Sequence, residues 1–230
     1  MGVCLRGSTL YAVMNDVNDD PQANPVSVLL VIDVADHKVL RSYEAKGSNG
    51  RHHFNHVTAD DHGNVYVSNT LKSAIYTVNT TVAGDTLKQL VAHNDLSWVH
   101  GIDISPDGAR LFSTSYGGGI KFFDLKSKTF SSFRDTTLNE NDGLKYDNGY
   151  LYGIGKNSLK RYTLNRDETA VLKTDILLRD HPFFNDPRCI HIEGGWIYCL
   201  TNIDFAIADF DRKASTRKSF EDTYILKYKL

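Results

Sequence analysis

The chain is poor in the residues on which several common protein classes depend. Its 230 residues include only 3 cysteines, 5 prolines and 2 methionines, and its formal net charge is −2. Three cysteines are too few for a disulfide scaffold, and their spacing does not fit a metal site. Without a basic excess, no surface is expected to neutralise nucleic-acid phosphates. We therefore expect no nucleic-acid partner.

Long apolar runs are also missing. The longest, Val26 to Val34, is far too short to span a bilayer, so we expect no transmembrane segment. The first residues carry no charged flank followed by a long apolar stretch, so the chain as written shows no secretory signal.

Two of the three cysteines, Cys189 and Cys199, fall on the two strands of one predicted hairpin. A cross-strand disulfide between them is therefore one alternative. Reduced thiols that behave as small apolar side chains are the alternative that we favour.

What the chain does contain is a repeat of a strand, a tight turn and a second strand with an aromatic residue. The aromatic residues are Tyr11, Tyr66, Phe112, Tyr152 and Tyr198, so successive copies are 55, 46, 40 and 46 residues apart. Short alternating strands at a period of this size are typical of a β-propeller, whose blades bury their faces against their neighbours. The sequence therefore predicts an all-β fold, a β-propeller with five blades.

We expect one propeller domain over residues 1–230, with blades at about 1–45, 51–93, 96–136, 139–182 and 184–230. Blade five ends after its third strand, and Met1 stands where the other blades place a polar residue. Either five blades close directly, or an upstream blade of a six-bladed ring is missing. We favour the second alternative, because closed propellers hide their sheet edges.

In four of the five blades a polar residue stands two positions before the first core aliphatic residue of the inner strand, and Met1 takes this position in the first blade. The series is Met1, Asn55, His100, Asp142 and Arg188. Inner strands start at one mouth of a propeller, so we expect the last four side chains to form a ligand-binding funnel. His53 is the neighbouring histidine that shares a strand face with Asn55, because side chains alternate along a strand.

Three segments resemble the SMP-30/gluconolactonase/LRE-like six-bladed propellers. They are residues 54–60 (FNHVTAD), 100–108 (HGIDISPDG) and 142–144 (DGL). The resemblance implies a divalent cation, usually calcium, held by Glu, two Asn and Asp, which activates lactone or ester substrates. It would place Asn55, His100 and Asp142 at the metal, with His100 as ligand or general base. Imidazole in place of an amide oxygen biases a site away from calcium toward transition metals. The Glu of the family would precede Met1 and cannot be assigned.

Hydrogen bonding of Asn55, His100 and Asp142 within the fold is an equal alternative to metal binding. Residues 54–57 and 63–67, with the C-terminal segments 196–198 and 224–228, are similar to the fungal Mala s 1-like branch, which includes a Malassezia allergen and a trichothecene gene-cluster propeller protein. That branch implies secretion, lipid or small-molecule binding, and a link to virulence or secondary metabolism. A cytoplasmic protein is the alternative location.

Three functions compete. We favour a non-catalytic or weakly catalytic propeller that binds a small apolar or amphipathic, lipid-like ligand in its funnel. A divalent-metal-dependent lactonase or esterase is the second, and a protein-interaction platform is the third. The sequence does not indicate an oligomeric state.

Overall fold

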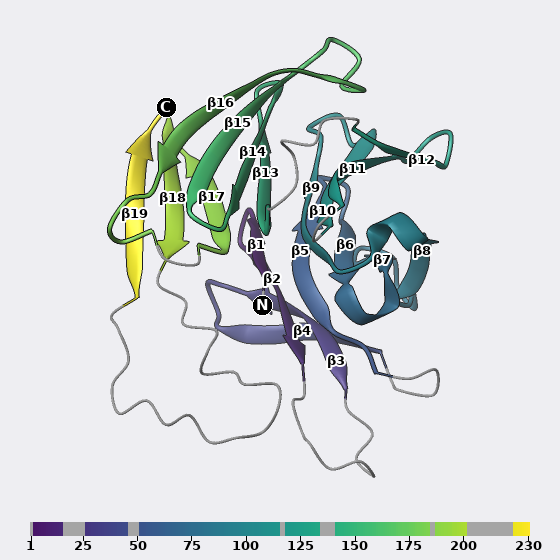
Figure 1. Ribbon diagram of the computed structural model, residues 1–230. Helices are drawn as coiled ribbons and strands as arrows, with labels where there is room; N and C mark the ends of the chain where they lie inside the picture. The colour runs from purple at the N-terminus through teal and green to yellow at the C-terminus, as the bar shows by residue number, and fades with distance from the viewer. Residues whose placement is uncertain are drawn as a thin grey trace. The chain divides into compact units, whose positions relative to one another are not determined.

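The computed structural model describes residues 2–15, 26–45, 51–115, 118–133, 141–184, 187–201 and 223–230. These residues form five antiparallel sheets, each an up-and-down meander of the kind that makes a propeller blade (Figure 1). Helix in these ranges is limited to two 3₁₀ turns, η2 (Thr70–Lys72) and η3 (Asn94–Leu96). None of the described helical segments has the length and hydropathy needed to cross a membrane. The prediction of an all-β propeller with five blades is confirmed.

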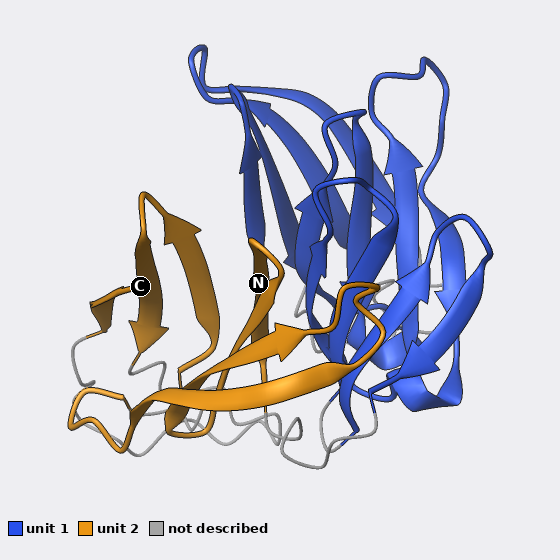
Figure 2. Ribbon diagram, turned by 90° about the horizontal axis from the view of Figure 1, so that it is seen from above, with its two compact units in different colours: residues 1–139 blue, residues 140–230 orange. Residues whose placement is uncertain are grey.

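The chain separates into two compact units, residues 1–139 and 140–230 (Figure 2). Unit 1 holds three four-stranded blades. Blade 1 comprises β1 (Val3–Arg6), β2 (Thr9–Asn15), β3 (Ser27–Asp33) and β4 (Lys38–Ala45). Blade 2 comprises β5 (Phe54–Ala59), β6 (Asn64–Asn69), β7 (Ala74–Asn79) and β8 (Lys88–Ala92). Blade 3 comprises β9 (Val99–Ile104), β10 (Arg110–Ser115), β11 (Gly119–Asp124) and β12 (Thr129–Ser132).

Unit 2 holds one four-stranded blade and one sheet with three described strands. Blade 4 comprises β13 (Gly143–Asp147), β14 (Tyr150–Gly155), β15 (Ser158–Leu164) and β16 (Val171–Arg179). Blade 5 comprises β17 (Cys189–Glu193), β18 (Trp196–Thr201) and β19 (Tyr224–Lys229). Strand order follows chain order within each blade.

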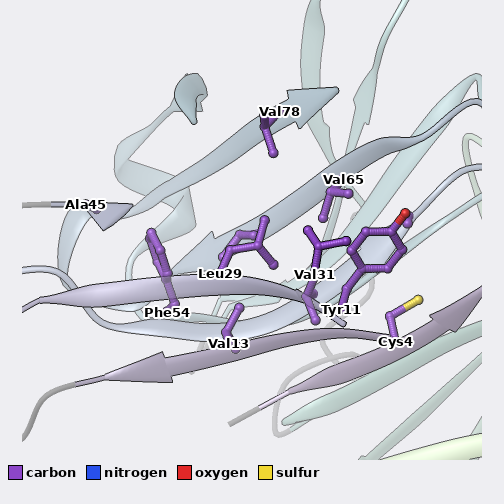
Figure 3. Close-up of a cluster of buried hydrophobic side chains, with 12 residues drawn as sticks. Cys4, Tyr11, Val13, Leu29, Val31, Ala45, Phe54, Val65 and Val78 are labelled. Atoms are coloured by element: carbon purple, nitrogen blue, oxygen red, sulfur yellow. The ribbon is translucent and has the colours of Figure 1, made fainter. Parts of the chain in front are cut away.

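Hydrophobic packing between neighbouring blades forms the core of each unit. In unit 1, Val13 and Leu29 of blade 1 and Phe54 and Val65 of blade 2 belong to one buried cluster (Figure 3). A second cluster joins blades 2 and 3 through Tyr66, Ile75, Ile102, Leu111 and Phe123. In unit 2, blades 4 and 5 share a third cluster that includes Ile154, Leu159, Ile190 and Ile197. Blade faces are therefore buried against the next blade, as the repeat predicts.

The repeated aromatic residues are core residues in four of the five blades. Tyr11, Tyr66, Phe112 and Tyr152 are at most 5% exposed. Tyr198 is only half-buried, and it pairs with His191 and Lys227 across blade 5. The aromatic position of the repeat therefore predicts a core residue in four of the five blades.

The three cysteines are free thiols. The β17–β18 register places Cys189 opposite Leu200 and Ile190 opposite Cys199, so the two cysteine side chains point to opposite faces of the sheet. The disulfide alternative is therefore wrong, and the preference for reduced thiols is confirmed. Burial raises the pKa of the Cys199 thiol to about 12, which leaves it unreactive.

Leu29 and Leu40 offer a matched test of the packing in blade 1. Leu29 is fully buried on β3, whereas Leu40 on β4 is 56% exposed. We expect Leu29→Ala to lower the free energy of unfolding by about 2–5 kcal/mol. Leu40→Ala should change it by no more than about 0.5 kcal/mol. Urea denaturation of both variants measures the difference, and equal effects would contradict the packing.

Candidate functional site

Two of the predicted funnel residues lie at the start of neighbouring inner strands in unit 1. Asn55 is the second residue of β5 and His100 the second residue of β9, and the two strands lie in contact. Both residues are half-buried. We call this end of unit 1 the strand-start end.

Hydroxyl groups of blade 2 join the two strands there. The Ser68 Oγ donates to the His100 carbonyl oxygen at 2.6 Å and accepts from the His56 N–H at 3.0 Å. One step along, the Thr70 Oγ1 donates to the Val99 carbonyl at 2.7 Å. These bonds fix the backbone on which Asn55 and His100 are mounted.

The side chain of Asn55 has one fixed contact. Its Nδ2 donates to the Thr70 Oγ1 at 3.0 Å, so the amide oxygen is oriented away from that bond. This arrangement is the one expected from the hydrogen-bonding alternative, and it leaves an acceptor for a ligand.

His53, which directly precedes β5, has an altered acidity. Burial lowers the pKa of His53 below its ordinary value, and the charge of nearby His100 lowers it further. At neutral pH His53 is therefore a neutral imidazole, which carries one donor and one acceptor nitrogen.

Two exposed apolar residues adjoin the residues of this polar group in the chain. Leu71 follows Thr70 and is 50% exposed, and Trp98 precedes Val99 and is 58% exposed. The bond between the Thr70 hydroxyl and the Val99 carbonyl places both at the strand-start end. Trp98 also has a positive φ of 52°, a strained conformation that is enriched at ligand sites. Neither residue was identified from the sequence, where each stands in a short polar connection.

The other two predicted funnel residues form an ion pair in unit 2. Asp142 directly precedes β13 and Arg188 directly precedes β17. The Arg188 guanidinium donates to the Asp142 Oδ2 at 2.6 Å, with side-chain exposures of 24% and 10%. The Asp142 N–H donates to the Ile154 carbonyl, which fixes the backbone. A partly buried pair of this kind orders both strand starts.

This pair does not fit the metal site that the resemblance implies. The Arg188 guanidinium binds the Asp142 carboxylate, and a metal cation at the same carboxylate would be repelled by this positive charge. Among the described residues, no three His, Cys, Asp or Glu side chains gather in a group that could hold a metal ion. The structure places Asn55 and His100 in unit 1, Asp142 and Arg188 in unit 2, and Met1 lies outside the described residues.

Lys121 is a buried charge that the sequence pattern did not indicate. It lies on β11 opposite Ser113 and Ser132 and is 7% exposed. Burial lowers the pKa of its amine, and the nearby Asp95 carboxylate opposes that shift. The only sequence signal was a lysine inside the apolar segment 120–123. The placement adds a polar group to the interior of blade 3.

Comparisons with known proteins identify the fold and no family. No family model matches the chain, and no curated protein matches it. Among solved structures, hydrazine synthase of Kuenenia stuttgartiensis is similar with a TM-score of 0.61 and 16% identity, over 89% of this chain and 56% of that one. A chain of a nidogen/laminin complex has a TM-score of 0.63 and 12% identity, over 97% of this chain and 78% of that one.

The Cps50 (Swd1) β-propeller domain of Myceliophteria thermophila is also similar, with a TM-score of 0.58 and 10% identity over 88% of this chain and 66% of that one. The fold is a β-propeller. At these identities the likeness extends to the fold alone. The chain spans little more than half of the hydrazine synthase chain.

The ion pair in unit 2 can be tested by a double-mutant cycle. We expect Asp142→Ala and Arg188→Ala each to destabilise the protein, because each leaves a partly buried charge without its partner. The double variant should lose less unfolding free energy than the two single variants lose together, with a coupling energy of about 1–3 kcal/mol. Chemical denaturation measures the cycle, and a coupling energy near zero would show that the two side chains do not interact.

The neutral state of His53 predicts a pH dependence of stability. Because its pKa is lower in the folded state, the unfolded chain binds more protons between the folded pKa and 6.5. The contribution of neutral His53 is therefore complete above pH 6.5 and falls as the pH drops toward the folded pKa. Denaturation curves measured from pH 8 to pH 5 should show a smaller loss of unfolding free energy for His53→Gln than for the unaltered protein. Equal losses would contradict the assignment.

Proposed function

We propose that this protein binds a small amphipathic ligand at the strand-start end of unit 1 and does so without catalysing a reaction. One observation carries the proposal: exposed Leu71 and Trp98 adjoin Thr70 and Val99 in the chain, and the bond between Thr70 and Val99 lies at the end where Asn55 and His100 are half-buried. Apolar and hydrogen-bonding groups thus lie together on a backbone fixed by Ser68 and Thr70.

The polar groups suit the head of such a ligand. Asn55 contributes an amide oxygen and His53 a neutral imidazole, so the head can both accept and donate hydrogen bonds. Binding sites of this type use a few fixed polar groups for orientation while apolar contacts supply most of the affinity.

The apolar groups suit the tail. Trp98 and Leu71 are both about half exposed, and covering them with a hydrocarbon removes apolar surface from water. An indole ring also contributes a large contact area with few rotatable bonds, which lowers the entropic cost of binding.

The motif resemblance supplies the biological setting. Residues 54–57 and 63–67, which are similar to the fungal Mala s 1-like branch, include Asn55 and the strand that follows it. The proposal therefore places the protein among secreted fungal propellers that bind lipids or small molecules in secondary metabolism or virulence.

The metal-dependent lactonase of the SMP-30/gluconolactonase type is the weaker alternative. It needs Asp142 as an anionic ligand, and Arg188 already neutralises that carboxylate at 2.6 Å. The residues present therefore do not fit the ion that such a reaction requires.

Tryptophan fluorescence provides a direct test of binding. The chain has 2 tryptophans, so in a Trp196→Phe background Trp98 is the only indole. We expect titration with decanoic acid to give a saturable change in emission, because the hydrocarbon covers the indole. His100→Ala in that background should weaken binding by about tenfold through loss of a polar contact.

His62→Ala is the matched control. His62 is exposed in the turn after β5, at the opposite end of that strand from Asn55, so its removal should leave the titration unchanged. Absence of a saturable response, or equal weakening by His62→Ala and His100→Ala, would contradict binding at this end.

Element analysis of the purified protein tests the metal-dependent lactonase alternative. We expect no stoichiometric divalent ion and no hydrolysis across a panel of lactones. An equimolar ion that Asp142→Ala abolishes, together with lactone hydrolysis, would replace the binding proposal with the enzymatic one.

A further inference from the structure

Lys121 of blade 3 is a buried amine without a bonded partner among the described residues. Its side chain is 7% exposed, and in this part of the chain it forms no hydrogen bond or ion pair. An isolated ammonium is costly in a protein interior, so buried lysines are normally paired or neutral. The contacts of the described residues therefore give this amine no structural role.

The strand register places Lys121 beside hydroxyl groups and apolar side chains. Ser113 on β10 and Ser132 on β12 lie directly opposite it, and Ile102 lies beyond Ser113 in the same row. Residues opposite one another on paired strands share a face of the sheet. Phe123, two positions along β11, lies on that face in the buried cluster between blades 2 and 3. The amine therefore belongs to an apolar interior that contains two hydroxyls.

Asp95 is the acidic residue that influences Lys121, and the two form no ion pair. The Asp95 carboxylate instead lies 3.8 Å from the His93 Nδ1, in a pair that is about half exposed. Burial has the larger effect and lowers the pKa of Lys121, whereas the Asp95 charge opposes this shift. The neutral, nucleophilic form of the amine is therefore more populated than at a lysine in water.

The end of Lys121 lies close to the surface at Gly118. Gly118 is exposed, and a Cβ atom placed on it would lie 3.7 Å from the Lys121 Cε. Neither the Lys121 Nζ nor the Ser113 Oγ is a fully enclosed polar atom without a partner, so both keep some contact with solvent. With so little of the side chain exposed, only a small molecule can reach the amine.

We propose that Lys121 is a site of covalent capture for small, uncharged aldehydes. The lone pair of the neutral amine attacks the carbonyl carbon, and a C–N bond forms as the carbonyl oxygen takes up a proton. The oxygen then leaves as water with the two protons that the nitrogen gives up, and a C=N double bond remains. The step needs neither an oxidant nor a reductant. The proposal is independent of ligand binding at Asn55 and His100.

The surroundings of Lys121 favour an aldehyde over an anion. A bound carboxylate would bring a second charge into an interior that already disfavours one, and the Asp95 charge would repel it. A neutral amine and an aldehyde give a neutral imine, so no charge is added. The Ser113 hydroxyl, opposite Lys121 on β10, supplies a hydrogen-bond donor for the carbonyl oxygen during the attack.

Reductive trapping with butanal and sodium cyanoborohydride at pH 7 tests the proposal on the unaltered protein. The reductant converts an imine into a stable secondary amine, and peptide mapping by mass spectrometry locates the butyl group. Lys126, exposed in the turn after β11, is the matched lysine of the same blade. We expect butyl labelling of Lys121 to be several-fold faster than that of Lys126, because more of a desolvated amine is neutral.

Two further measurements show whether the fold causes the difference. After unfolding in urea, Lys121 and Lys126 should be labelled at equal rates, because burial is lost. In the folded protein, the rate at Lys121 should level off below pH 10.5, the ordinary lysine pKa, because burial lowers the pKa of this amine.

Lys121→Met tests the premise that the amine has no structural partner. Methionine keeps an unbranched stem of similar length and removes the charge. We expect the urea midpoint of this variant to equal or exceed that of the unaltered protein, because a buried charge without a partner does not stabilise the fold. Lys126→Met is the control at an exposed position and should leave the midpoint unchanged.

Three results would overturn the proposal. Labelling of Lys121 no faster than that of Lys126 would show that the amine is not activated. A rate at Lys121 that still rises above pH 10.5 would show that a counter-ion holds the ammonium. A large loss of stability in Lys121→Met alone would assign the amine to the fold, and the labelling of the unaltered protein stays decisive if that variant fails to fold.

Discussion

The packing of one blade face against the next is the interaction on which this structure depends. A single sheet cannot bury both faces alone, and each unit solves this by sharing a cluster between neighbours, as Leu29 with Phe54 or Ile154 with Ile190. Because hydrophobic contact is not directional, it leaves the exact register of neighbouring inner strands open. The hydroxyls of Ser68 and Thr70 fix this register, since each donates a hydrogen bond to a carbonyl of the adjacent blade.

The same hydroxyls determine what the strand starts can do. Ser68 and Thr70 hold the backbone that carries Asn55 and His100, and the Thr70 hydroxyl also accepts a hydrogen bond from the Asn55 side chain. In unit 2 the corresponding positions carry opposite charges and satisfy one another. One position in the repeat therefore carries the proposed ligand contacts in unit 1 and an ion pair in unit 2.

The repeat predicted the fold because period and alternation are local properties of a sequence. The strand starts at Asn55, His100, Asp142 and Arg188 were located in the same way. The sequence could not predict the ion pair, because Arg188 and Asp142 are 46 residues apart and meet only in the folded chain. Trp98 and Leu71 were missed for a related reason: an exposed apolar residue in a connection becomes informative only when its neighbours in space are known. The burial of Lys121 was likewise not predicted, because a lysine inside a strand carries no local signal that it lies in the interior.

The central claim is that an amphipathic ligand lies on Trp98 with its head toward His100 and Asn55. Contacts between ligand and protein protons, measured by NMR on the protein saturated with decanoic acid, test this claim most directly. The account predicts nuclear Overhauser effects from the acyl methylenes to the Trp98 indole and to Leu71, and from the methylene next to the carboxylate to the His100 ring. Effects confined to other residues, with Trp98 and His100 untouched, would contradict it.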